Sequence, residues 1–237
     1  MTPQQAPTAG RLAVPGRRLL AAMVIWLVLA GAGFGLALAF IRFSPVGRAH
    51  RADLLAVALL EAYLALLVAL LAAFGGTSGL RRYLGFRFTS GAHLALALVT
   101  WMACLAGGVL LDAAFIPVLG PPPSNTARLL SIAFDPLFIV LIVLTVCLVA
   151  PVCEELFFRG ALYGWMRGRW PLLVAIPVSA AIFAGAHVIV PLLPTLFVFG
   201  LGAAWIRERT GSTLNSFAMH ATQNTFAVVT TYILLSR

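Results

Sequence analysis

The sequence predicts an all-α integral membrane protein with seven to eight transmembrane helices. Of its 237 residues, 62% are hydrophobic and only 10% are charged, and the mean hydropathy is +1.02. Soluble domains carry about 25% charged residues. The apolar runs are long enough to cross a bilayer and are separated by basic, Pro-rich or Gly-rich breaks, and no alternating strand pattern is visible.

Three apolar runs are expected in the N-terminal part, which we place at residues 19–134. Residues 1–18 are Pro-rich, polar and basic, and we expect a disordered cytoplasmic tail there. The run at 19–42 exceeds the 7–15 residues of a signal-peptide core, so we interpret it as a retained transmembrane helix. Further spans are expected at 53–74 and 91–111, followed by a loop at 112–134. Gly31 and Gly35 lie on one face of the first span and could form a helix contact.

The C-terminal part, residues 135–237, contains the remaining predicted spans. The fourth begins near Asp135 and Pro136 and runs to a pair of glutamates, and Pro151 is expected to kink it or to separate a second helix at 152–166. Later spans are expected at 171–189, 195–206 and 212–235. The total is seven spans, or eight helices if Pro151 breaks the fourth.

The net charge of +9 arises from sixteen arginines and no lysine. On the seven-span topology more of these arginines lie on the side of the N-terminus, so the positive-inside rule places the N-terminus and the glutamate pair toward the cytoplasm. A bacterial inner membrane is the expected location. Because the arginines are scattered between apolar spans, we expect the lipid bilayer as a partner and no nucleic acid. Cys104, Cys147 and Cys153 lie in apolar runs without metal-ligand spacing, which argues against a disulfide framework or a zinc finger.

Glu154 and Glu155 are adjacent carboxylates inside the fourth apolar run. A charge at the bilayer centre costs about 3 kcal/mol on insertion scales, so such residues mark functional sites. Arg159 follows Glu155 by four residues, and the two can form an ion pair on one helix face. Glu154 has no such partner on its own helix.

Two further polar pairs lie in later apolar runs, each with a spacing of four. His187 follows Phe183, whose ring can pack against the imidazole, and Asn224 follows His220. A carboxylate beside an imidazole can hold and deprotonate a water molecule. A second imidazole and an amide can donate hydrogen bonds to an oxyanion. Together the three pairs predict a hydrolase.

Each pair also has a structural interpretation, and two other functions remain open. Intramembrane His and Asn often join helices by hydrogen bonds, and an ion pair can serve the fold alone. Buried Glu and His also serve as proton relays, which would make the protein a proton-coupled transporter, although charged residues are few and no inverted repeat is visible. A non-proteolytic immunity or regulatory membrane protein is the other alternative.

The three motifs, in this order on successive apolar spans, resemble the CPBP family of intramembrane proteases. This group contains CAAX proteases, bacteriocin-processing enzymes and the type II CAAX prenyl endopeptidases, and the resemblance covers about residues 135–235. It implies an eight-helix fold with a catalytic cavity open to the cytoplasm. It further implies the following roles: water activation by Glu154 and His187, an oxyanion site at His220 and Asn224, and a supporting ion pair between Glu155 and Arg159.

The resemblance leaves the metal requirement and the substrate open. The family is often labelled metalloprotease, while the other view is a glutamate mechanism without metal. No H-E-x-x-H signature is present. If zinc is used, Glu154, His187 and His220 are the candidate ligands, with water as the fourth. We favour water activated by glutamate. The expected substrate is a membrane-tethered protein or peptide, and a prenylated CAAX protein is one candidate.

Overall fold

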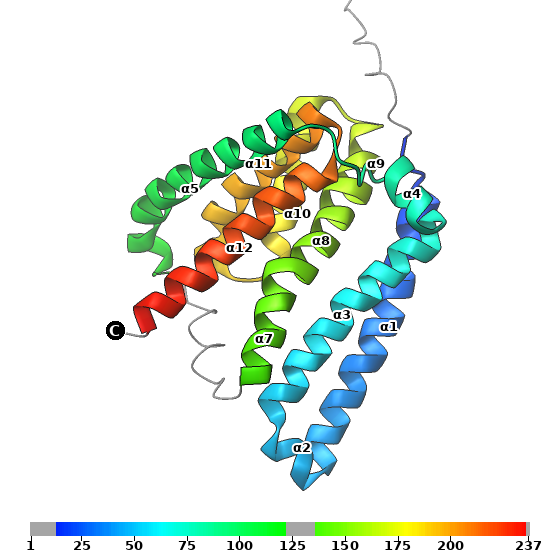
Figure 1. The fold of residues 1–237 in the computed structure, drawn as a ribbon, viewed down its shortest axis with the longest axis vertical. Coiled ribbons are helices and arrows are strands. Elements are labelled where there is room, and N and C mark those ends of the chain that lie inside the picture. The colour runs from blue at the N-terminus through cyan, green and yellow to red at the C-terminus, as the bar shows by residue number, and fades with distance from the viewer. Residues whose placement is uncertain (1–12, 122–135, 236–237) are drawn as a thin grey trace, which may run out of the picture.

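The computed structural model describes residues 13–121 and 136–235, and in these ranges it is helical without any strand. This confirms the predicted all-α class. The helices, shown in Figure 1, are α1 (Gly16–Phe43), α2 (Pro45–Ala49), α3 (Arg51–Phe74), α4 (Gly76–Arg82), α5 (Gly91–Leu119), α7 (Pro136–Leu144), α8 (Ala150–Glu155), α9 (Tyr163–Arg167), α10 (Leu172–Ala186), α11 (Leu193–Thr210) and α12 (Thr213–Leu235). Two π-helical segments, η1 (Thr145–Val149) and η2 (Leu156–Leu162), and a 3-10 turn, η3 (Val190–Leu192), complete the described part.

In the part of the chain that the structure describes, five helical runs are long and apolar enough to cross a membrane: Gly16–Phe43, Asp53–Phe74, Gly91–Leu119, Ile139–Arg167 and Val190–Thr210. The chain is therefore an integral membrane protein, but the expected count of seven to eight spans is not reached by this measure. Helix α10 is apolar but short. Helix α12 is long, but its polar residues, which include His220 and Asn224, lower its mean hydropathy.

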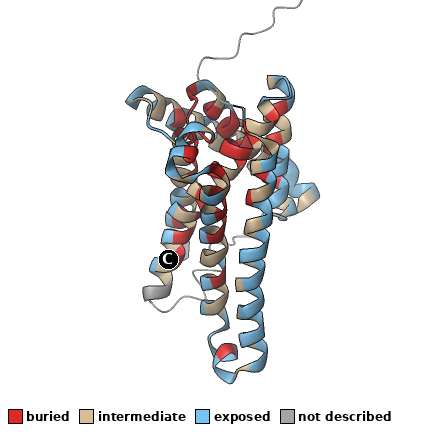
Figure 2. Ribbon diagram, turned by 90° about the vertical axis from the view of Figure 1, so that its right-hand side faces the viewer, coloured by how far each residue is buried: buried red, intermediate tan, exposed pale blue. Residues whose placement is uncertain are grey.

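Helices α1 and α3 form an antiparallel hairpin with α2 at its tip (Figure 1). The indole of Trp26 donates a hydrogen bond to the Ala62 carbonyl, 3.0 Å away, and so ties the two helices together. Figure 2 shows that most of this hairpin is exposed, whereas buried residues gather where the other helices pack. None of the most apolar stretch of α1 is buried in the protein, as expected for a surface that faces lipid.

The closest glycine contact in the hairpin is at Gly33, where an added Cβ would overlap the Glu61 carboxylate. A Cβ added at Gly31 or Gly35 would meet no atom within 4 Å, so this pair does not form the helix contact within the chain that its spacing suggested. Small residues let membrane helices approach closely. In this hairpin the small residue lies on the face of α1 that meets α3.

We expect Gly33→Ala to destabilise the hairpin, because the new methyl group must displace the Glu61 side chain or separate α1 from α3. We expect a cost of about 1 kcal/mol, the low end of the range for overpacking, because the atoms in the way are the carboxylate end of a flexible side chain that can move aside. Gly35→Ala is the matched control, and its extra methyl group meets open space. Unfolding in mixed micelles measures both changes. Equal midpoints for the two variants would contradict this account of the hairpin.

The fourth run does not stop at the glutamate pair, as the sequence suggested, but continues to Arg167. Pro151 does not separate two helices either. It stands at the start of α8 and directly follows η1, whose wider π turn accommodates the missing N–H of proline. Glu154 therefore lies in the middle of the run Ile139–Arg167 and not near its end.

Two helices have ends that differ from those predicted from the sequence. Helix α5 extends to Leu119 and ends at Gly120, which has a φ of 77°, so residues 112–119 are helical and not part of a loop. At the N-terminus the helix begins at Gly16, and the Val14 side chain is only 1% exposed, so the predicted tail boundary at residue 18 is too late. The rest of the expected tail and loop, residues 1–12 and 122–135, lies outside the described residues.

The loop after α4 anchors the start of α12 and thereby joins the two parts of the chain. The Thr213 amide donates to the Gly85 carbonyl at 3.0 Å, and the Asn215 amide donates to the Thr89 hydroxyl at 2.9 Å. Gly85 has a φ of 70° and lies against the Arg207 guanidinium, so a side chain there would be strained and would collide. This anchor fixes the helix that carries His220 and Asn224.

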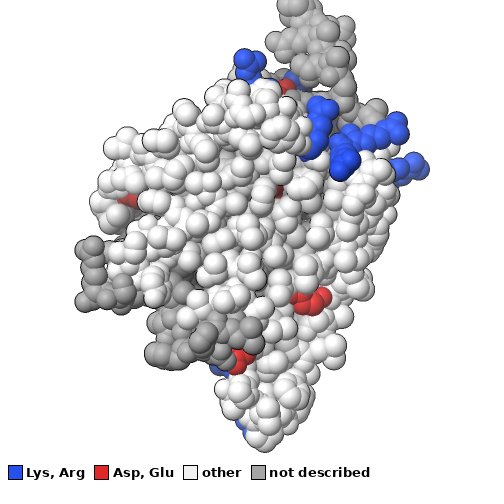
Figure 3. Space-filling view, viewed as in Figure 1, with Lys and Arg blue, Asp and Glu red and all other residues white. Residues whose placement is uncertain are grey.

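Basic side chains gather at one end of the molecule, where α1 begins and α4 lies (Figure 3). Four exposed or half-buried arginines from these two helices contribute, namely Arg17, Arg18, Arg81 and Arg82. The face shown between the two ends carries a few red patches and no basic cluster. A concentration of arginines at one end of the membrane-spanning helices is the pattern that the positive-inside rule describes.

Candidate active site

Glu154, His187 and His220 come together from three helices, α8, the end of α10 and α12. One carboxylate oxygen of Glu154, Oε2, lies 3.8 Å from His220 Nε2 and 4.0 Å from His187 Nε2. The Glu154 side chain is 13% exposed and that of His187 is 28% exposed. The three groups thus meet at a partly accessible point, and the gap between carboxylate and imidazole is too long for a direct hydrogen bond.

Tyr63 is a member of this cluster that the motifs did not reveal. Its hydroxyl donates a hydrogen bond of 2.7 Å to Glu154 Oε1, so it holds the carboxylate by the oxygen that faces away from the two imidazoles. The Cys153 thiol donates to the Tyr63 carbonyl at 3.2 Å and fixes α3 against α8. The available signal was weak: Tyr63 is the only tyrosine in the three N-terminal runs, and nothing in its spacing links it to Glu154.

Glu155 points to the other side and holds two cationic or potentially cationic groups. Its Oε1 lies 3.0 Å from Arg159 Nη1, which is the ion pair that the spacing of four predicted. The same oxygen lies 3.0 Å from His220 Nδ1. Glu155 and Arg159 are both 0% exposed, and His220 is 4% exposed. Since His220 meets a glutamate at each ring nitrogen, it links the two carboxylates.

Phe183 forms the aromatic wall of the site and is itself fully buried. Its ring lies edge-on to His187 at 4.8 Å and to His220 at 5.8 Å between centroids. The Arg159 guanidinium carbon lies 4.1 Å from the Phe183 ring centroid, a cation–π distance. The contact with His187 agrees with the role expected from the spacing, whereas the contact with Arg159 does not follow from it.

The hydrogen-bonding partner of His187 fixes how its imidazole can act. Nδ1 lies 2.9 Å from the Phe183 carbonyl oxygen. A carbonyl oxygen only accepts hydrogen bonds, so Nδ1 must carry the proton. In the neutral ring Nε2 then presents a lone pair on the side of Glu154.

Asn224 stands one turn after His220, and its amide nitrogen donates to the Val146 carbonyl in η1 at 2.8 Å. An amide group carries two N–H donors, so this contact leaves one of them for another acceptor. The π-helical segment therefore orients Asn224 through a backbone carbonyl. Its neighbour Gln223 accepts a hydrogen bond of 2.7 Å from the Trp101 indole and joins α12 to α5.

The candidate zinc ligands have suitable chemistry but not a suitable arrangement. Each imidazole turns Nδ1 to an acceptor and Nε2 toward Glu154, as metal-bound histidines often do. Even so, no group of three His, Cys, Asp or Glu residues in the described ranges is placed so that it could hold a metal ion. The described residues do not fit a bound metal, so we derive the chemistry from the side chains.

One protein family matches a segment in the C-terminal part of the chain. Residues 136–226 match the family described as type II CAAX prenyl endopeptidase Rce1-like. The match includes all three motifs and excludes Tyr63. It confirms the CAAX-protease resemblance that the motifs predicted, and this family is a protease family. No curated protein and no solved structure gives a significant match.

Proposed function

We propose that this chain, whose residues 136–226 match the family described as type II CAAX prenyl endopeptidase Rce1-like, is an intramembrane endopeptidase that uses a water activated by Glu154. The observation that carries this proposal is the position of the Glu154 carboxylate. One of its oxygens is held by the Tyr63 hydroxyl at 2.7 Å, and the other faces the Nε2 atoms of His187 and His220.

In the first step a water molecule is held between Glu154 and His187. The 4.0 Å between Glu154 Oε2 and His187 Nε2 allows one water to hydrogen-bond to both atoms. Glu154 takes a proton from this water while the His187 lone pair orients it. The hydroxide oxygen then forms a bond to the carbonyl carbon of the peptide, and the carbonyl π electrons move to its oxygen.

In the second step the oxyanion collapses and the peptide bond breaks. We assign the donors for the oxyanion to Asn224, through its second amide N–H, and to His220, whose doubly protonated ring donates from Nε2 while Nδ1 remains on Glu155. Protonated Glu154 returns its proton to the leaving nitrogen as the C–N bond breaks. The step yields a carboxylic acid and an amine and leaves Glu154 ionised for the next cycle.

Glu155 and Arg159 support this chemistry without touching the substrate. The ion pair and the aromatic rings around Arg159 hold Glu155 against His220 Nδ1, and this contact fixes the orientation of the imidazole. Glu155 therefore acts through His220. Glu154 acts on water directly, so the two adjacent glutamates have separate roles.

The substrate that best fits this position is a peptide tethered to the membrane. Glu154 lies in the middle of a membrane-spanning run, and a soluble peptide would have to leave water to reach it. The family indicates a CAAX-type substrate. We further propose seven membrane crossings, counting α10 and α12, in a bacterial inner membrane, with the basic end of the molecule, the N-terminus and the opening of the site on the cytoplasmic side.

The direct test is cleavage of lipidated peptides by the purified protein in detergent. Farnesylated CAAX peptides and unlipidated peptides of the same sequence are incubated with and without a chelator, and the products are identified by mass spectrometry. We expect the lipidated peptide to be cleaved in the presence of the chelator as well as in its absence. Proton-coupled flux in liposomes without any cleavage would instead favour a transporter.

We expect Tyr63→Phe to lower kcat by about 10- to 100-fold with little change in KM. The variant keeps the ring and removes only the hydroxyl that donates to Glu154, and a hydrogen bond to a charged group contributes about 1.5–3 kcal/mol. Tyr83→Phe is the control, since Tyr83 packs through its ring against Phe74 and Arg18. An unchanged kcat in Tyr63→Phe would remove Tyr63 from the site.

A further inference from the structure

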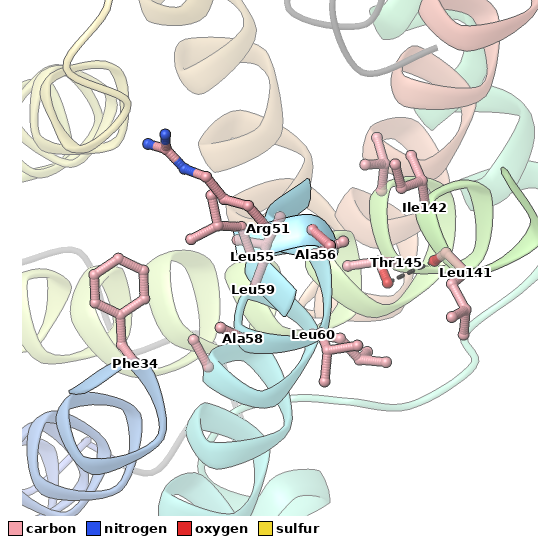
Figure 4. Close-up of a pocket in the computed structure, with 14 residues that line it drawn as sticks. Phe34, Arg51, Leu55, Ala56, Ala58, Leu59, Leu60, Leu141, Ile142 and Thr145 are labelled. Carbon is pink, nitrogen blue, oxygen red and sulfur yellow. Dashed lines mark hydrogen bonds between the residues drawn. The ribbon is translucent and has the colours of Figure 1, made fainter. Parts of the chain in front are cut away.

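An apolar pocket of about 720 Å³ opens between the α1–α3 hairpin and the helical run that begins with α7 (Figure 4). Drug-sized ligands occupy pockets of about 300–1,000 Å³. One wall comes from α3, the opposite wall from α7 and η1, and Phe34 of α1 closes one side. Apart from Arg51 and Thr145, the lining is alanine, valine, leucine, isoleucine and phenylalanine, and the Thr145 hydroxyl is bonded to the Leu141 carbonyl at 2.7 Å.

We propose that this hairpin pocket binds an anionic diacyl phospholipid, with an acyl chain between the two walls and the phosphate on Arg51. Arg51 is the first residue of α3 and lines the same end of the pocket as Ala49. Figure 4 shows its guanidinium extending away from the apolar side chains. Among the described residues Arg51 forms no ion pair, and the nearest carboxylate in the sequence, that of Asp53, pairs with His50 at 3.1 Å.

The pocket extends from the headgroup level into the apolar part of the membrane, as a phospholipid molecule does. Arg51 immediately precedes the membrane-spanning run Asp53–Phe74, so its guanidinium lies at the level of lipid headgroups. The deepest lining residues are Ala62, well inside that run, and Val146, well inside the run Ile139–Arg167. A phosphate would pair with the arginine at one end of the pocket, and a hydrocarbon chain would contact the apolar residues along the rest. A prenyl group would use the apolar walls and leave the cation without a partner.

Occupancy of the pocket is coupled to the active site through two neighbouring residues. Val146 lines the pocket, and its carbonyl accepts the hydrogen bond of Asn224. Ala62 lines it as well and is followed by Tyr63, which bonds Glu154. A bound acyl chain would pack against η1 and α3 and limit movement of both. This lipid site goes beyond the proposed peptidase activity, and its binding test does not depend on that activity.

The test is native mass spectrometry of the full-length protein in a neutral detergent, which counts the lipids bound to each chain. Phosphatidylglycerol, phosphatidylcholine with the same acyl chains, and inorganic phosphate are titrated separately. We expect phosphatidylglycerol to bind most tightly. Arg51→Gln should weaken it roughly fivefold, which corresponds to about 1 kcal/mol per basic residue near a surface. Arg48→Gln is the matched control, because Arg48 lies in α2 at the same tip and does not line the pocket.

A second variant, Ala56→Trp, fills the pocket from the α3 wall and should weaken binding of both lipids. Far-UV circular dichroism and the elution volume of each variant show that it is folded. Equal binding of the two lipids, an unchanged affinity in Arg51→Gln, or equal binding of inorganic phosphate would each overturn the proposal. Displacement of phosphatidylglycerol by a farnesylated peptide in equal amount would also overturn it and would assign the pocket to the substrate.

Discussion

We expect the replacement of Glu154 with glutamine to lower peptide cleavage by about 10²- to 10⁴-fold, the range for removal of a general base. The amide has nearly the same shape and can still accept the hydrogen bond of Tyr63 through its carbonyl oxygen. It cannot take a proton from water. The loss should therefore appear in kcat, with a folded protein and a substrate affinity close to that of the wild type. Cleavage of the lipidated peptide at saturating substrate measures it.

The matched control for this change is Glu61→Gln. Glu61 is a second carboxylate inside a membrane run, and it faces Gly33 on α1, within the hairpin. The substitution alters charge in the same way at a similar depth but outside the candidate site. Activity within threefold of the wild type is expected there. Full cleavage by Glu154→Gln would end the assignment of Glu154 as the base, whatever the control shows.

The local parts of the site could be predicted from the sequence because each lies within one helical turn. The spacing of four between Glu155 and Arg159 places them on one face, and their Nη1–Oε1 distance is 3.0 Å. The contact between Phe183 and His187 has the same origin. Tyr63 could not be found in this way. Its bond to Glu154 joins residues 91 positions apart, and only the packing of α3 against α8 creates it.

The continuation of the fourth helical run past Pro151 could not be predicted from the sequence pattern either. Proline inside a helix predicts a kink or a break, because it lacks an N–H and its ring collides with the preceding turn. Here Pro151 is the second residue of α8, and η1 directly before α8 supplies a wider turn, so the helical run continues to Arg167. The carbonyl of Val146 in the same segment orients Asn224. Which backbone turn relaxes around a proline depends on neighbouring helices.

We expect Arg159→Met to lower the free energy of unfolding by about 3–5 kcal/mol, the cost of leaving one partner of a buried ion pair without the other. Glu155 is 0% exposed, and Arg159 is its cationic partner at 3.0 Å. Methionine preserves much of the hydrophobic volume beside Phe183 but brings no charge. His220 would then be the remaining neutralising group for Glu155. Unfolding in mixed micelles at several detergent ratios measures the loss.

Two comparisons separate this electrostatic cost from a packing cost. Arg167→Met removes a pair with Glu208 that has a 3.4 Å contact and an arginine that is 32% exposed, and such partly exposed pairs contribute about 1 kcal/mol or less. The double variant Glu155→Gln with Arg159→Met removes both buried charges and should recover part of the stability lost in Arg159→Met. It should not recover cleavage, because the amide oxygen can still accept from His220 Nδ1 but no longer carries the negative charge beside this ring. If the double variant is no more stable than Arg159→Met, the guanidinium stabilises the fold through its stacking on Phe183, and the carboxylate–arginine pair is not the main contribution.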